Sequence, residues 1–226
     1  MTGATDSGRD GVHTGRLRPA PRQHGFARNE EFAIVDSSVV GGDPVLQMRL
    51  APTEYSRAMW AHEFEYLYTV TLREGSLDTR VEVRNTGDEA FEFTGALHTY
   101  FAATDIGAVR VGGLEDLTYL DKVADPMDPD VKQSASGALA IGSAVDSVYL
   151  DAPAVLSLET GHPAPLRLEA ASGWTDAVVW SPWTAMESCY KEFVCVEHAT
   201  VRPSSLAPGE TWTAEMSLAA SGCVRS

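Results

Sequence analysis

Two titratable side chains stand inside apolar runs that are typical of β-strands. His98 lies in the run FEFTGALHTYFAATDI, which starts at residue 91, and Glu197 lies in FVCVEHATV, which starts at residue 193. Because alternate side chains of a strand face opposite ways, we expect His98 on a polar face beside Tyr100 and Glu197 on an apolar face. Burial raises the pKa of a carboxylate towards neutral pH, where it can serve as a general base. The pattern makes both residues candidates for proton transfer.

Both side chains also fit purely structural roles. A histidine on a strand is often a surface residue or a hydrogen-bonded part of the sheet. A glutamate at a frayed strand end or on an edge strand simply reaches water. The spacing of His98 and Glu197 alone leaves these alternatives open.

Polar side chains that could hold a ligand gather in two other places. The segment RQHGFARN, residues 22–29, places the donors Arg22, Gln23, His24, Arg28 and Asn29 around one glycine. Arginine presents a fixed fork of N–H groups, which suits a polyhydroxylated or anionic ligand. The same segment could equally be a polar turn.

Asp146, in SAVDSVYL, is a candidate acceptor for sugar hydroxyls, although a turn or capping aspartate has the same local pattern. The sequence contains no metal-ligand spacing and no phosphate-binding loop among these stretches. A histidine, a glutamate, a donor cluster and an acceptor together favour acid–base chemistry on a hydroxylated substrate.

The charge balance restricts the class of partner. The 226 residues carry 17 Lys and Arg against 32 Asp and Glu, a formal net charge of −15. Such a field repels phosphate backbones and anionic membrane surfaces, so we expect neither nucleic acid nor a membrane as partner. An anionic small molecule would need a local cluster of basic residues.

Cysteine usage and the N-terminus bear on the compartment. Cys189, Cys195 and Cys223 form no C-x-x-C pair, which favours free thiols in a reducing compartment. The first residues lack the apolar core of a signal peptide, and no run of about 18 apolar residues occurs. We therefore expect a cytoplasmic protein, although a partial organelle-targeting sequence remains an alternative.

Short runs rich in Val, Thr, Phe, Tyr and Leu alternate with Gly, Pro and Asn punctuation along most of the chain, which predicts many short strands. We expect residues 1–22 to be disordered, 23–226 to form a single domain, and 120–132 to form a loop. The predicted strands cover about 31–36, 45–50, 63–73, 77–84, 91–101, 107–112, 147–150, 154–159, 165–170, 177–180, 193–201 and 212–219. Without βαβ alternation, this predicts an all-β fold, an antiparallel β-sandwich.

Several motifs occur together in a recognisable order. They are HGFARN, ALHTYF with TDI, VRVGGLEDLTYLDKV, VDSVYLDAP, DAVVWSPW, YKEFVCVEHA and LAPGETW. In this order they resemble the glucose-6-phosphate 1-epimerase group of the aldose 1-epimerase, or mutarotase, family, over about residues 23–218. The resemblance implies a galactose-mutarotase-like supersandwich with the sugar in an open cleft on one concave sheet.

The resemblance also implies roles for particular residues. His98 matches the catalytic histidine and Glu197 the catalytic glutamate, whereas Gln23, Arg28 and Asp146 match substrate-binding positions and His24 belongs to the same pocket. The implied reaction interconverts the anomers of a hexose 6-phosphate, with glucose 6-phosphate expected. Glu197 would be the base and His98 the acid, and no metal or other cofactor is required.

One departure from the family pattern concerns the N-terminus. Family members carry further strands before the HGFAR-type motif, including a Gly-Gly-Ile-Pro-like segment and an arginine for the phosphate, and residues 1–22 show neither. We therefore expect a shortened chain, monomeric or weakly self-associating. The alternatives are a sugar-binding or sensing protein with little turnover and, less favoured, a glycosidase, which would need two flanking carboxylates.

Overall fold

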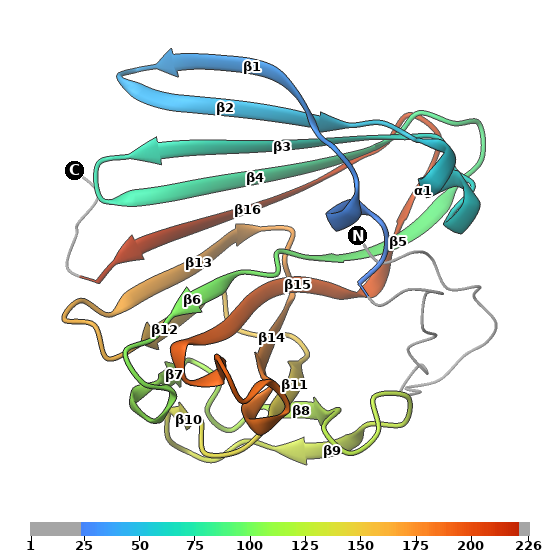
Figure 1. Cartoon of the computed structure of the whole chain (residues 1–226). Coiled ribbons are helices and arrows are strands. Elements are labelled where there is room, and N and C mark those ends of the chain that lie inside the picture. The colour runs from blue at the N-terminus through green and yellow to red at the C-terminus, as the bar shows by residue number, and fades with distance from the viewer. Residues whose placement is uncertain (1–23, 222–226) are drawn as a thin grey trace.

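Antiparallel strands account for most of residues 24–221, the part of the chain that the computed structural model describes. They form two sheets packed face to face (Figure 1). The order in the nine-stranded sheet is β1 (Ala33–Val40), β2 (Asp43–Leu50), β3 (Phe64–Arg73), β4 (Ser76–Asn85), β16 (Thr211–Ala220), β13 (Leu166–Ser172), β12 (Val155–Glu159), β7 (Arg110–Gly112) and β10 (Leu139–Ala140).

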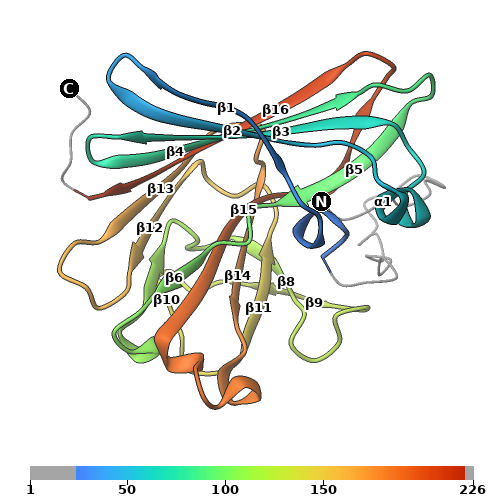
Figure 2. The ribbon, with the colours of Figure 1, turned by 45° about the horizontal axis from the view of Figure 1, so that its top comes forward.

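The seven-stranded sheet carries the predicted catalytic residues. Its order is β5 (Phe91–Ala96), β15 (Phe193–Leu206), β14 (Asp176–Ser181), β11 (Val145–Tyr149), β8 (Thr118–Asp121) and β9 (Asp130–Gln133), and β6 (Tyr100–Ala102) also pairs with β15. Seen from another side, this sheet lies beneath the strands β1 to β4 and β16 (Figure 2). The predicted all-β sandwich is confirmed.

Helical structure is limited to short connections. They are α1 (Glu54–Met59) and the 3-10 turns η1 (Ala27–Asn29), η2 (Ile106–Ala108), η3 (Trp183–Met186) and η4 (Tyr190–Glu192). None of the helices in the described part of the chain is long and apolar enough to cross a membrane.

Helix α1 starts at a capping box that the sequence analysis missed. The hydroxyl of Thr53 accepts a hydrogen bond from the Ser56 amide at 3.0 Å, and the Ser56 hydroxyl accepts one from the Thr53 amide at 2.8 Å. A serine here takes the place of the usual glutamate or glutamine, so the sequence signature is weak. The sequence analysis expected no element between the strands predicted over 45–50 and 63–73.

Two apolar clusters hold the sheets together. One includes Phe64, Val83 and Phe93, and the other includes Leu158 and Val179, with all five side chains buried. Leu218 on β16 packs against both clusters. Burial of this kind, at about 25 cal/mol per Å² of apolar surface, is the main force that fixes the sandwich.

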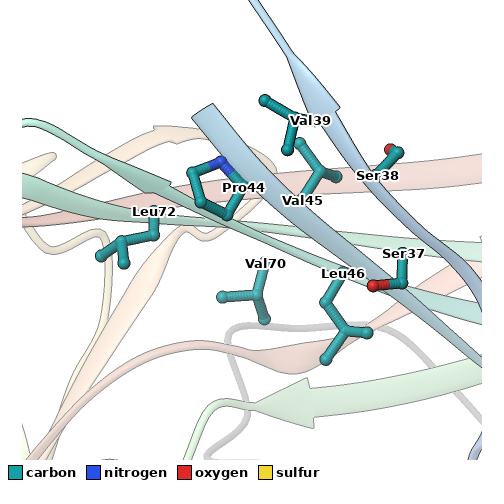
Figure 3. A pocket seen from close by; sticks show the side chains of 8 residues that line it. All are labelled: Ser37, Ser38, Val39, Pro44, Val45, Leu46, Val70 and Leu72. Carbon is teal, nitrogen blue, oxygen red and sulfur yellow. The ribbon is translucent and has the colours of Figure 1, made fainter. Parts of the chain in front are cut away.

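Part of the larger sheet's apolar surface remains open. The tips of β1, β2 and β3 form a groove with Val39, Pro44, Leu46, Val70 and Leu72 in its wall (Figure 3). Val39 is 69% exposed and Leu72 is 56% exposed, so no element among residues 24–221 covers this face. Exposed apolar patches are typical contact surfaces, and the weak self-association expected from the sequence stays a prediction.

Two predicted boundaries were wrong. The strand expected over 91–101 is interrupted between Ala96 and Tyr100. The loop expected over 120–132 is shorter in the structure, because β8 ends at Asp121 and β9 begins at Asp130. These two strands pair with each other in a hairpin, so strand pairing overrides the turn-forming composition at both ends of this segment. The region 1–22, expected to be disordered, lies outside the described residues.

Candidate active site

The register of the smaller sheet brings Glu197 and Asp146 onto one face. Glu197 on β15 pairs with Val178 on β14, and Trp180 of β14 pairs with Asp146 on β11. Residues opposite each other in an antiparallel pair project to the same face, and so do alternate residues along a strand. The other face, which includes Val179 and Val196, joins the core. Glu197 shares its face of β15 with the apolar Cys195 and Ala199, whereas the core-side face also carries the buried His198.

His98 reaches the same face although its strand is interrupted. Ala96 of β5 pairs with Ala199, and Tyr100 of β6 pairs with Cys195. The two ladders share one register, in which His98 is the residue opposite Glu197. The interruption bends the backbone between these ladders, where the Thr99 amide donates to the Leu97 carbonyl at 2.8 Å.

The structure brings the two predicted catalytic side chains into contact. Nδ1 of His98 lies 3.3 Å from Oε1 of Glu197, and the two side chains are 23% and 7% exposed. The angle between the groups is too poor for a hydrogen bond, so Nδ1 is left without a partner among the described residues. No hydrogen bond from another described residue reaches the Glu197 carboxylate either. Both groups therefore keep hydrogen-bonding capacity for a substrate.

Burial shifts the two pKa values in opposite directions. Desolvation, with a smaller contribution from the charge of Asp146, raises the pKa of Glu197 to about 8, and Lys122 opposes this shift. Desolvation and then the charge of Arg28 lower the pKa of His98. Burial disfavours the charged form of each group. At neutral pH, Glu197 is therefore mainly protonated and His98 neutral.

Aromatic rings fix the orientation of His98. The Tyr100 ring stacks on the imidazole at 5.0 Å with 8° between the planes. Trp180 meets His98 edge-on at 6.1 Å, and the His24 ring meets it edge-on at 5.0 Å. Contacts on several sides hold the imidazole in one orientation, which acid–base catalysis requires.

The segment before β1 delivers His24 and Arg28 to the site because Phe26 between them is anchored. Phe26 is buried and packs on Trp60 and Phe64 with ring centroids 6.1 and 5.6 Å apart. His24 adopts a φ of 67°, a region that non-glycine residues rarely occupy and that costs on the order of 1 kcal/mol. Strained backbone of this kind is common at functional sites.

The electrostatic surroundings of His24 and Arg28 tie them to the site. Desolvation, followed by the charges of His98 and Arg28, lowers the pKa of His24 to about 4. Arg28 is exposed, and its charge also acts on His98. Gln23, the remaining predicted binding residue, lies outside the described residues.

Two residues of this face were missed in the sequence. Lys122 follows β8, and its ammonium lies 3.5 Å from Oδ1 of Asp146. Trp180 lies between Asp146 and Cys195 in the sheet register. Lys122 is one of only three lysines in the chain, which was an available signal. Its proximity to Asp146 depends on the pairing of β8 with β11, which no local pattern specifies.

No metal site accompanies these residues in the part of the chain that is described. There, no group of three or more His, Cys, Asp or Glu side chains is arranged to hold a metal ion. The chemistry available to the visible side chains is proton transfer between a carboxyl group and an imidazole, beside a carboxylate and two cations.

Comparison with known sequences identifies the family. The family described as Aldose 1-epimerase matches this chain over residues 19–219. A protein of Cenchrus ciliaris named "Putative glucose-6-phosphate 1-epimerase" is 35% identical over 215 residues, covering 88% of this chain and 64% of its own. A protein of the same name from Escherichia coli K12 is 29% identical over 193 residues, covering 80% of this chain and 63% of its own.

Solved structures agree on the fold. A "putative mutarotase" from Salmonella typhimurium superimposes with a TM-score of 0.76 at 23% identity, over 92% of this chain and 69% of that one. A galactose mutarotase related enzyme from Lactobacillus acidophilus gives 0.73 at 16% identity, over 90% and 75%. The predicted galactose-mutarotase-like fold is confirmed.

The family match spans nearly the whole described chain, but the chain spans only part of the length of its relatives. The chain covers 64% and 63% of the length of the two sequence relatives. The family match from residue 19 to residue 219 includes every candidate site residue named above. The chain belongs to the aldose 1-epimerase family.

Proposed function

We propose that this protein interconverts the α and β anomers of a hexose 6-phosphate, with glucose 6-phosphate as the expected substrate. The observation that carries the proposal is the convergence of His98 and Glu197, 3.3 Å apart on one face of the smaller sheet. Membership of the aldose 1-epimerase family supports the reaction, and the names of the sequence relatives support the phosphorylated substrate.

The reaction opens and recloses a cyclic hemiacetal. A base takes the proton of the anomeric hydroxyl while an acid gives a proton to the ring oxygen, so the bond between C1 and the ring oxygen breaks. The free aldehyde turns about the C1–C2 bond and closes on its other face, with the two groups exchanging roles. A proton transfer of this kind contributes about 10²–10⁴-fold to the rate.

The proton inventory of the site fits this exchange. At neutral pH, the free pair holds one proton, which resides on Glu197 while His98 is neutral. With Glu197 as base and His98 as acid, this is the arrangement reached after ring opening. Before a cyclic sugar opens, the proton must move from Glu197 to His98, and ring opening restores the first arrangement.

The remaining candidate residues would hold the sugar. Asp146 offers acceptors for hydroxyl groups, and Arg28 and Gln23 offer donors, with His24 packed against His98. In a chain with a net charge of −15, the local cations Arg28 and Lys122 offset the repulsion of a phosphate. We propose the alternative of a sugar-binding protein with little turnover only if exchange is not observed.

We infer further that the protein acts in the cytoplasm on a small molecule, without a nucleic-acid or membrane partner. The described cysteines, Cys189 and Cys195, are free thiols, which supports a reducing compartment. A single domain over residues 23–226, in monomeric or weakly self-associating form, remains part of this proposal.

The decisive experiment measures anomer exchange of glucose 6-phosphate by saturation-transfer NMR. His98→Asn and Glu197→Gln should each lower the exchange rate by about 10²–10⁴-fold while the circular dichroism spectrum stays unchanged. His162→Asn and Glu159→Gln are matched controls, because both residues are exposed and lie outside the site, and they should retain the wild-type rate.

Three outcomes separate the alternatives. Wild-type rates in both site variants would show that the mechanism is wrong. Binding of glucose 6-phosphate without exchange above the spontaneous rate would favour the sugar-binding protein. Faster exchange of glucose or galactose than of their 6-phosphates would leave the reaction in place and reject the phosphorylated substrate.

A further inference from the structure

Lys122 belongs to a stretch, LTYLDKV, whose role the proposed reaction does not explain. Its backbone amide donates to the Asp146 carbonyl at 2.8 Å, and its ammonium lies 3.5 Å from Oδ1 of the same residue. Both side chains are partly buried. Asp146 is thus held by Lys122 through the main chain and the side chain together.

The Lys122–Asp146 pair acts on Glu197 across the sheet face. Asp146 and Glu197 project from the same face, separated by the strand that carries Trp180. Two negative charges on one partly desolvated face disfavour each other's ionisation, and an adjacent ammonium offsets that effect. After desolvation, the charge of Asp146 is the cause that raises the pKa of Glu197, and Lys122 is the cause that lowers it.

Other titratable or charged groups surround Glu197 without taking this role. They are Cys195 on its own strand, Tyr100 on β6, His98 between β5 and β6, and Asp176 on β14. On β14, its neighbour Val178 cannot titrate. Lys122 is therefore the cation that acts on the charge of Glu197.

We propose that Lys122 is a positioning residue, which fixes the Asp146 carboxylate beside the sugar and sets the pH range in which Glu197 exchanges its proton. The inference rests on the proposed function, since it describes the same site. It assigns Lys122 no contact with the reacting atoms. Lys122 acts on Asp146 through direct contact and on Glu197 through its charge.

The hairpin of β8 and β9 offers a matched control. Lys132 on β9 lies 2.7 Å from the carboxylate of Asp121, with about half of its side chain exposed. Lys132→Met removes a lysine–aspartate pair from the same hairpin without touching Asp146. It should leave both the pH profile and the Michaelis constant unchanged.

The test is the pH profile of kcat/KM for anomer exchange. Lys122→Met should move the alkaline limb to higher pH by roughly 0.5–1 unit, less than the 1–3 units typical of a direct ion contact. The Michaelis constant should also rise, and this increase should be several-fold larger than the decrease in kcat. Lys122→Arg should return the alkaline limb to its wild-type pH, because arginine also carries a positive charge.

A second readout does not depend on turnover. The carboxyl carbon of Glu197, followed by ¹³C NMR in the free protein, should titrate at higher pH in Lys122→Met. In Asp146→Asn it should titrate at lower pH. If the wild-type protein shows no exchange, the proposed function fails, and this titration still decides the inference. If Lys122→Met does not fold, Asp146→Asn alone must move the titration downwards.

Two results would overturn the inference. One is an unmoved titration of Glu197 in the variants of both Lys122 and Asp146. The other is a higher Michaelis constant for glucose 6-phosphate, but not for glucose, with an unmoved alkaline limb, which would make Lys122 a direct phosphate contact.

Discussion

Two buried carboxylates project from the same face of the smaller sheet, and their surroundings differ sharply. Asp176 pairs with Ala199 and Glu197 pairs with Val178, so the two acids lie on neighbouring strands within two residues of each other. Their side chains are 0% and 7% exposed. Burial alone therefore does not distinguish them.

The donors around Asp176 make it a structural residue. Its Oδ1 accepts from the Asp151 amide and from Arg202, each at 3.1 Å. Its Oδ2 accepts from the Val201 amide at 2.9 Å and from the Thr175 hydroxyl at 3.1 Å. A carboxylate that accepts from four donors has its hydrogen-bonding capacity satisfied within the fold.

Glu197 has no such set of donors. Its described polar neighbour within contact distance is the poorly aligned imidazole of His98 at 3.3 Å. Its charged form is therefore disfavoured, and its pKa is raised to about 8. The comparison indicates that the number of donors, more than the depth of burial, separates a carboxylate that holds the fold from one that exchanges a proton.

The largest effect on stability should come from the satisfied acid. Asp176→Ala leaves the amides of Asp151 and Val201 without their acceptor and removes one of the two carboxylates that pair with Arg202. Each amide left without an acceptor costs about 1–3 kcal/mol, and the lost contact with the half-exposed Arg202 adds less than about 1 kcal/mol. Urea unfolding at pH 7 measures the change, and a loss below about 1 kcal/mol would contradict the structural role of Asp176.

The sequence predicted one of these acids and not the other, for a physical reason. Glu197 stands out because alternation places a charge among apolar residues, and His98 stands out as a histidine within an apolar, aromatic run. Asp176 begins DAVVWSPW at the edge of an apolar run, where an aspartate usually caps a strand or turn. Three of its four donors, from Asp151, Val201 and Arg202, lie 25 or 26 residues away in the sequence, and only the fold brings them together.

Strand pairing, which local sequence does not specify, also explains what was missed in the rest of the site. The shared register of His98 and Glu197 depends on two separate ladders that β15 makes with β5 and β6. The sequence predicted a single unbroken strand there, and this strand is interrupted between Ala96 and Tyr100. Lys122 lay inside a stretch expected to be a loop, and its contact with Asp146 depends on the pairing of β8 with β11.

A smaller effect should come from the unsatisfied acid, with the opposite sign. The folded pKa of Glu197, about 8, lies above its value in the unfolded chain, so the folded protein binds the extra proton. The stability that this proton provides is complete below the unfolded pKa and is lost as the pH rises through about 8. The limiting slope is about 1.4 kcal/mol per pH unit.

Glu197→Gln removes this dependence. The variant should be more stable than the wild type by roughly 2–3 kcal/mol at pH 7, and the difference should shrink towards pH 4.5. Urea unfolding of both proteins from pH 4.5 to 9 measures it. A difference that stays constant over this range would show that Glu197 does not titrate as described.

The smallest effect should come from Asp151, which belongs to the Asp176 network only at its surface. Its carboxylate pairs with Arg202, whose Nη1 lies 3.2 Å from Oδ2, but the Asp151 side chain is 75% exposed. An exposed ion pair contributes less than about 1 kcal/mol.

Asp151→Asn is a clean test because the backbone φ of 53° at this position is one that asparagine tolerates. The variant also keeps the amide that donates to Asp176. Urea unfolding should therefore show a loss below about 1 kcal/mol that fades at high salt. A loss as large as that of Asp176→Ala would mean that the network depends on its exposed partner, and that donor number at Asp176 is not what holds this end of the sheet.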